Sequence, residues 1–426
     1  MTTLNERERI YRIALLVSIS CVLQISESMI PHPVPGLRLG LANMLALVAM
    51  VSMGVRAALE VALYRTLISS LLMGTFMSPT FILSFSAALV STAMMGLFYR
   101  FSAASWRYGF SIIGVSIAGA LTHNMVQLFL AYLILVKHTG IFVLFPWLAI
   151  GAVATGWITG LVAGGVCRRL EGSEATAPQT DAGTGDVEKP EARGYIPGTS
   201  PIHRMPAAVK LGALLILATA VLFLSNRWAF AVLFSLLAAG IATARIPFSA
   251  VIGRVRKYAF LVVLAVALPI LFNTGVRVAT TIGGFHVTTE GLSTGLTLGL
   301  RILFLIAASS LATMTTSPRE MTAGLTKILF PLRRLGGSEE RIATVFTLAW
   351  ASFPEIWAAA RSAIRSENFR KEAGVRSMIP LISNVIASLY MEATPDGRLW
   401  REAVPQESDA LHTDTPTPGR ASERRS

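Results

Sequence analysis

Charged residues and cysteines are scarce in this chain. Only 14% of its 426 residues are charged, and its two cysteines lie far apart, Cys21 inside an apolar run and Cys167 beside two arginines. This spacing indicates neither a disulfide framework nor a cysteine-based metal site. With 53% hydrophobic residues and a mean hydropathy of +0.60, the composition lies outside the usual range of soluble domains. The sequence therefore predicts an integral membrane protein.

Two motifs of phosphate chemistry are also missing. The chain contains no Gly-Lys dipeptide and therefore no phosphate-binding loop of the form G-x-x-x-x-G-K-[ST]. It contains no Asp-Asp pair, and so no D-D-x-x-D cluster that would hold magnesium against a diphosphate. We therefore expect no catalytic residue, no metal site and no cofactor in this chain. Any ATP hydrolysis, with its magnesium, is expected on another subunit.

Long apolar runs recur along most of the sequence. About ten or eleven of them reach roughly 17–25 residues, enough for a helix to cross a hydrocarbon core of roughly 30 Å. We expect spans near residues 10–30, 39–55, 57–76, 79–100, 109–136 and 141–166, then near 208–225, 228–244, 258–273 and 289–314. The first run lacks a small-residue cleavage site, so it is expected to remain as an anchor. The predicted fold is an all-α membrane protein with six helices in its first half.

Basic residues mark the ends of the apolar runs. The formal charge of +13 sits mainly in short loops, and clusters such as Arg168 with Arg169 fall on one side of the predicted topology. By the positive-inside rule this side is the cytoplasm. We therefore expect a multi-pass protein of the cell membrane with both termini on the cytoplasmic side. The basic residues form no patch interleaved with aromatics, so the expected partner is the lipid bilayer and not nucleic acid.

Two polar segments divide the sequence. Residues 170–200 are rich in Gly, Ala, Thr, Pro and acidic residues, a composition that cannot bury enough apolar surface to fold alone. Residues 397–426 are similarly polar. We expect a disordered cytoplasmic linker and a disordered tail, which leaves two membrane domains at residues 1–169 and 201–396.

Polar side chains within the predicted spans of the first half stand out. A charge near the bilayer centre costs about 2.5–3.5 kcal/mol on insertion scales, so it needs a partner or a cavity. These side chains are Glu60, Arg65, His123, Asn124 and Gln127. The spacing of the spans predicts that Arg65 and His123 share a depth near the midplane. One hypothesis is a buried network that only fixes helix packing, and the other is a polar cavity for a small ligand. Arg301, in the second half, is expected to be mainly structural, since no second polar residue near it completes a site.

After residue 315 the pattern of the sequence changes. From Ile342 to Ile364 the apolar residues follow the three-and-four spacing of an amphipathic helix, and arginines continue beyond it. One interpretation is a helix lying on the inner leaflet with its basic residues near anionic lipid. The other is a docking surface for a cytosolic partner.

Three segments of the second half resemble a known family. They are "HRMPAAVKLGALLIL" (203–217), "GLTLGLRILFLI" (295–306) and "LATMTTSPREMTAGLTKILFPLRRLGG" (311–337). Over residues 201–396 the sequence resembles the transmembrane T component of energy-coupling-factor transporters, the CbiQ-like family. In that family two helices dock into a pair of ABC-type ATPases through Ala-Arg-Gly motifs, so the resemblance implies two such ATPases, which bind ATP and magnesium, as partners.

The docking motifs of that family correspond here to "FRKEAG" (369–374) and "YMEATPDG" (390–397), where Thr394 takes the place of the expected arginine. The resemblance implies cytoplasmic amphipathic coupling helices in this part of the chain. The residues implied in coupling to the ATPases are Arg361, Arg365, Arg370, Gly374 and Arg376.

The first half resembles a different component. The segments "PHPVPGLRLGLANMLAL" (31–47), "MSPTFILS" (77–84) and "THNMVQ" (122–127) are similar to the Gx group of substrate-binding S components, also labelled heptaprenyl diphosphate synthase component I. S components are six-helix proteins that capture vitamins or related small molecules and deliver them by toppling against the T component. Small residues on their first helix contact the T component, a role that the resemblance gives here to Ala14 and Ser18.

The prolines at positions 31, 33 and 35 form a stiff strap that continues neither neighbouring helix. It is either a simple helix breaker or, with the Gx resemblance, a lid whose Arg38 and Asn43 face a cavity mouth. The predicted substrate-binding residues are Arg38, Asn43, Glu60, Arg65, His123, Asn124 and Gln127. Two arginines among them favour an anionic or carboxylate-bearing ligand.

Together these observations favour a natural S–T fusion, the membrane half of an importer for a vitamin-like or cofactor-precursor molecule. One alternative is a membrane accessory subunit of a prenyl diphosphate synthase, as the label on the first-half family suggests. Another is a scaffold that transports nothing, in which the intramembrane charges only pair with one another.

Overall fold

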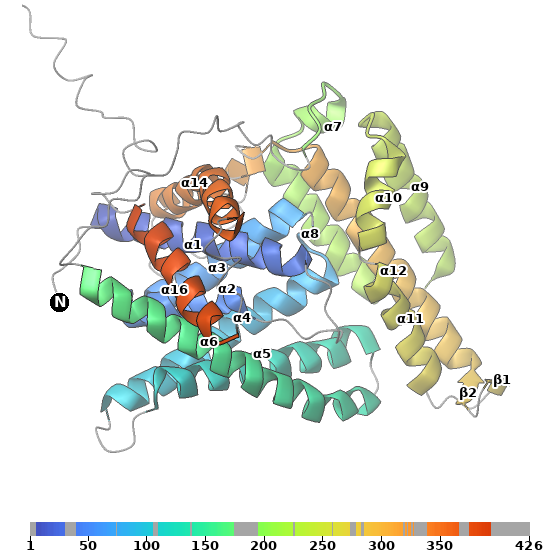
Figure 1. Cartoon of the computed structure of the whole chain (residues 1–426). Helices are drawn as coiled ribbons and strands as arrows, with labels where there is room; N and C mark the ends of the chain where they lie inside the picture. Colours follow the sequence, from blue (N-terminus) through green and yellow to red (C-terminus); the bar gives the residue numbers. More distant parts are fainter. Residues whose placement is uncertain are drawn as a thin grey trace, which may run out of the picture.

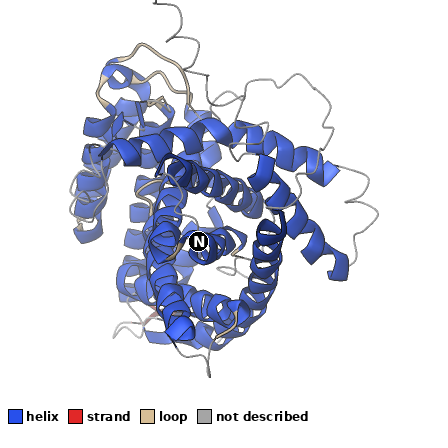
Figure 2. Cartoon of the chain, turned by 90° about the vertical axis from the view of Figure 1, so that its left-hand side faces the viewer, coloured by secondary structure: helices blue, strands red, loops and turns tan. Residues whose placement is uncertain are grey.

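The computed structural model is almost entirely helical (Figure 2). It describes residues 6–29, 40–73, 75–104, 110–136, 139–173, 195–224, 226–257, 259–272, 278–282, 285–317, 320–321, 323–324, 327, 339–365 and 375–392. Within these residues the only strands are β1 (Val278–Ile282) and β2 (Phe285–Thr288), which pair as an antiparallel hairpin. The prediction of an all-α membrane protein is confirmed.

The first half folds into a bundle whose helices follow the apolar runs. Its elements are α1 (Glu6–Met29), α2 (Leu41–Met53), α3 (Val55–Met73), α4 (Pro79–Ala104), α5 (Ile112–Ala131) and α6 (Phe145–Ser173), with the short turns η1 (Tyr132–Val136) and η2 (Thr139–Leu144) before α6. Gly54 separates α2 from α3 at φ 91°, a left-handed conformation that favours glycine. Helices α1, α2 and α3 pack on one another, and α5 packs against both α4 and α6.

The second half has two parts. Its first part contains α7 (Pro201–Arg204), α8 (Ala207–Phe223), α9 (Arg227–Thr243), α10 (Phe248–Lys257), α11 (Ala259–Phe272) and α12 (Thr289–Met314). Its second part contains α14 (Glu339–Arg365) and α16 (Val375–Glu392). In Figure 1 the helices α8 to α12 gather on one side of the first-half bundle, whereas α14 and α16 lie across it beside α1.

Among the described residues, six segments are long and apolar enough to span a membrane. They are Glu8–Glu27, Thr80–Phe101, Ile112–Ile134, Thr139–Leu170, Thr289–Met314 and Arg341–Arg361. This count is below the predicted ten or so, although a helix lies near every predicted position. The helix α2 has only 13 residues, and α3 carries three charged residues, so neither satisfies the length and composition of a simple span.

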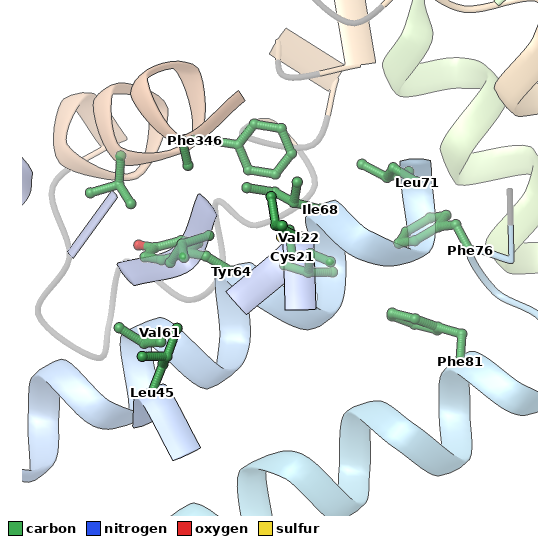
Figure 3. Packing of buried hydrophobic residues seen from close by; sticks show 14 of the residues in the cluster. Cys21, Val22, Leu45, Val61, Tyr64, Ile68, Leu71, Phe76, Phe81 and Phe346 are labelled. Carbon is green, nitrogen blue, oxygen red and sulfur yellow. The ribbon is translucent and has the colours of Figure 1, made fainter. Parts of the chain in front are cut away.

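The apolar face of α14 is covered by the first half of the chain. Val345 and Ala349 are fully buried there, and α14 makes extensive contacts with α1 and further contacts with α3. Figure 3 shows the ring of Phe346 pointing from α14 toward Ile68 of α3. Phe346 is 1% exposed, and burial of such a ring stabilises a fold by about 1.5–3 kcal/mol. The apolar face of α14 is therefore packed against α1 and α3 of the same chain.

Candidate functional site

A polar cavity lies within the first-half bundle and takes side chains from all six helices. The space between its walls measures ≈ 810 Å³ including the open mouth, which sets an upper limit on the size of a ligand. The polar residues that line it are Gln24, Glu27, Asn43, Arg65, Thr66, Ser84, Ser91, Ser116, His123, Asn124, Gln127, Thr155 and Thr159. Five of the seven predicted binding residues are among them.

Arg65 forms the positively charged wall of the cavity. Its side chain comes from the middle of α3 and the residue is only 4% exposed. Its Nη1 donates to Oε1 of Gln24 on α1 at 3.2 Å, and its Nη2 donates to Oδ1 of Asn43 on α2 at 2.7 Å. Hydrogen bonds to a charged group contribute about 1.5–3 kcal/mol each, so the two amides fix the guanidinium in place. Three helices thus present one cation to the cavity.

Glu27 supplies a negative charge to the same cavity. It lies near the end of α1, is 4% exposed, and accepts a hydrogen bond from the backbone N–H of Gly40 at 3.0 Å through Oε1. Gly40 precedes α2 in a left-handed conformation at φ 73°, which favours glycine. Glu27 therefore ties the end of α1 to the beginning of α2.

Gln24 and Glu27 were not predicted as binding residues. They lie three residues apart in "CVLQISES" (21–28), which places them on one face of a helix. Two polar residues with this spacing at the end of an apolar run are the signal that identifies them. Their position beside Arg65 depends on the packing of α1 against α3, which no local pattern describes.

The residues predicted on α5 lie in the cavity wall with the expected spacing. His123 and Gln127 are one turn apart, and Asn124 donates from Nδ2 to the carbonyl oxygen of Leu148 on α6 at 3.0 Å. Ser116 and Thr159 share a hydrogen bond of 2.9 Å between their hydroxyls. The wall made by α5 and α6 is therefore rich in amide and hydroxyl groups.

Glu60 lies outside the cavity, contrary to the prediction. It precedes Arg65 by five residues, which rotates it by about 140° around α3 from the Arg65 side. Its two carboxylate oxygens instead accept hydrogen bonds from Nη2 of Arg341 on α14, at 3.1 and 3.0 Å. Arg38, the other predicted residue, lies outside the described residues.

Ala14 and Ser18 of α1 face the second half of the chain. Ser18 Oγ donates to the carbonyl oxygen of Ala349 on α14 at 2.6 Å, and both α1 residues are buried. On the other side of the bundle α16 approaches α6 closely, because a Cβ at Gly165 would lie 2.6 Å from Oγ of Ser383. The two halves therefore contact each other through small residues.

The residues implied in ATPase coupling are described only in part. Arg361 is exposed on α14, with its guanidinium carbon 5.6 Å from the centre of the Trp357 ring. Arg365 ends α14 and Arg376 lies in the first turn of α16, but their side chains fall outside the described residues. Arg370 and Gly374 lie outside them as well, as does Thr394.

Two cations of the second half, the partly buried Arg301 and the buried Lys210, contact backbone carbonyls. Arg301 on α12 donates from Nη2 to the carbonyl oxygen of Leu224, which caps α8, at 2.8 Å. Lys210 donates from Nζ to the carbonyl oxygens of His203 at 3.3 Å and Thr315 at 2.8 Å. The last carbonyls of a helix lack partners within it, so these cations satisfy helix ends.

The chain matches two family models. Residues 198–395 match the model described as cobalt transport protein, CbiQ. The second half is therefore similar to the CbiQ family over nearly its whole length. Residues 16–166, which include nearly all of the cavity wall, match the model described as heptaprenyl diphosphate synthase component I. The predicted resemblance of the two halves to two different families is confirmed by these matches.

Curated relatives of the CbiQ half are transporter proteins. The energy-coupling factor transporter transmembrane protein EcfT of Listeria innocua is 27% identical over 216 residues, 49% of this chain and 81% of that protein. The protein of the same name from Bacillus subtilis is 27% identical over 209 residues, 47% of this chain and 78% of its own length. These matches support a membrane component of the energy-coupling-factor type in the second half of this chain, and they agree with the expectation that the chain is not an enzyme.

Proposed function

We propose that this chain combines substrate capture and energy coupling in one importer subunit. The first half binds a vitamin-like or cofactor-precursor molecule in the cavity around Arg65. The CbiQ half connects that binding domain to two separate ABC-type ATPases, which hydrolyse ATP. The domains are residues 1–169 and 201–396, with the linker at 170–200, the tail at 397–426 and both termini on the cytoplasmic side of the cell membrane.

One observation carries this proposal: the helices that build the charged end of the cavity are those that α14 contacts. Gln24 and Glu27 lie on α1, and Arg65 lies on α3. The α14 helix is bonded to α1 through Ser18 and to α3 through Glu60. A displacement of α14 would therefore move cavity walls, which is the coupling that an ATP-driven importer requires.

The second candidate function is a membrane accessory subunit of a prenyl diphosphate synthase. The description of the family matched by residues 16–166 favours it. Under this alternative the CbiQ half has no role, and the contacts of α14 with the cavity helices serve only stability. The importer accounts for both halves and for their contact.

Affinity purification of the full chain from native membranes separates the two functions. Recovery of two ABC-type ATPases is expected for the importer, whereas recovery of a soluble prenyl synthase would support the alternative. A chain that brings down neither, and that releases no small molecule when denatured, would overturn the importer. Arg65→Ala should abolish ligand retention while the ATPases still co-purify, and unchanged uptake in this variant would refute the cavity assignment.

A further inference from the structure

Two residues of opposite charge, Arg65 and Glu27, line the cavity, and each has its own hydrogen-bond partners. Arg65 donates to the neutral amides of Gln24 and Asn43, while Glu27 accepts from the backbone of Gly40. Both charged residues are 4% exposed and both line the cavity. A buried cation and a buried anion thus line one cavity, and a ligand that carries both charges would complement the two of them.

The two side chains differ in hydrogen-bonding chemistry. A guanidinium offers only donors, in a planar fork that suits a carboxylate or phosphate. An ionised carboxylate offers only acceptors, and each of its oxygens has two acceptor sites, so Glu27 can accept from Gly40 and from a ligand together. A ligand that is only anionic would satisfy Arg65 but would be repelled by Glu27.

From this arrangement we infer that the cavity selects a small zwitterion, a molecule with an anionic group that binds Arg65 and a protonated amine that binds Glu27. The inference rests on the proposed function, because it names the substrate class of the same cavity. It differs from the expectation of a purely anionic ligand, because Glu27 adds a buried carboxylate to the cavity wall that holds Arg65. Hydroxyls of Ser116 and Thr159 on the α5 and α6 wall suit the polar remainder of such a molecule.

A purely structural role for Glu27 makes a different prediction. Gln at this position keeps an oxygen that accepts the Gly40 N–H, so Glu27→Gln removes the charge and preserves the tie between α1 and α2. If Glu27 served only that tie, the substitution would leave ligand selection unchanged. Glu8→Gln is the matched control, because Glu8 is a carboxylate on the same helix that pairs with Arg12 at 2.6 Å and does not line the cavity.

The experiment uses the full chain in lipid nanodiscs and three probes of similar size: β-alanine, propionate and propylamine. Thermal stabilisation by equal concentrations is expected to be largest for β-alanine. Glu27→Gln should weaken β-alanine binding about tenfold or more and leave propionate binding equal or stronger, since it removes one partner of a charged hydrogen bond. Glu8→Gln should change neither.

Other outcomes overturn the inference or the function beneath it. Propionate that stabilises the chain as well as β-alanine, with no effect of Glu27→Gln, would overturn the zwitterion and leave the importer standing. If no probe stabilises the chain, the charge of the molecule released by denaturing protein from native membranes is tested instead. Retention of this molecule on a cation exchanger in acid and on an anion exchanger in alkali supports the zwitterion. Retention on the anion exchanger alone overturns it. If no probe binds and no molecule is released, both the inference and the importer fall.

Discussion

The two halves of this chain use their buried and partly buried cations in different ways. In the first half Arg65 is held by side-chain amides from two other helices, at the wall of a cavity. In the second half Arg301 and Lys210 donate to backbone carbonyls at helix ends. A cation that satisfies helix ends stabilises the fold, whereas a cation positioned by amides around a cavity can also bind a ligand. The partner of a buried cation is thus a better guide to its role than its burial.

The largest expected effect comes from removing the cavity cation. Arg65→Ala should weaken ligand binding by about 30-fold to 4,000-fold, because truncating one partner of a buried charged contact costs about 2–5 kcal/mol. The measurement is the quantity of small molecule released by denaturing equal amounts of purified chain. Arg301→Ala is the control and should release the wild-type quantity. An equal loss of released small molecule in Arg65→Ala and Arg301→Ala would mean that Arg65 is no more involved in ligand binding than Arg301.

Removing the structural cation should lower stability instead. Arg301→Ala leaves the carbonyl oxygen of Leu224 without its donor, so the free energy of unfolding should fall by about 1–3 kcal/mol. Thermal unfolding of the chain in nanodiscs measures this loss. A normal melting temperature in Arg301→Ala would contradict the assignment of this residue to a helix end.

The contact between the halves should matter for transport more than for binding. Ser18→Ala removes the bond to the carbonyl of Ala349 and should cost about 1 kcal/mol of stability at this contact. Uptake into proteoliposomes with the ATPases should fall several-fold, while ligand retention by the isolated chain stays normal. Parallel loss of retention would show that Ser18 acts on the cavity itself, and unchanged uptake would remove it from the coupling contact.

The smallest effect is expected at the ion pair between α3 and α14. Glu60→Gln should cost about 0.2–1 kcal/mol, because both side chains are partly exposed and such pairs contribute little. Exchange of the two charges, in a chain with both Glu60→Arg and Arg341→Glu, should restore much of the loss. Ligand retention should not change in either variant. A change in retention would mean that Glu60 contributes to ligand binding after all.

Sequence periodicity predicted the helices well because it reports which faces avoid water. The apolar runs located α1 to α6, and the spacing of His123 and Gln127 placed them together on one side of α5. Helical geometry also explains the misplacement of Glu60, since five residues turn a side chain away from Arg65. That prediction relied on closeness in sequence where rotation around the helix decides.

Features that arise from packing between distant segments could not be predicted in the same way. Glu27 reaches the cavity only because α1 packs beside α2 and α3. The apolar face of α14 was evident in the sequence, but periodicity does not say whether lipid, another protein or the same chain covers it. Here α1 and α3 cover it, a long-range choice that local patterns do not contain.

The bond from Ser18 to Ala349 also bears on biosynthesis. It joins residues 331 positions apart, and Phe346 fills the core beside it. The ribosome must therefore synthesise most of the chain before α14 can pack against α1 and α3. Until then the apolar surfaces of α1 and α3 are exposed to the translocation machinery and to lipid. A truncated transcript that ends in the linker would yield a binding domain with an uncovered face, a natural substrate for membrane quality control.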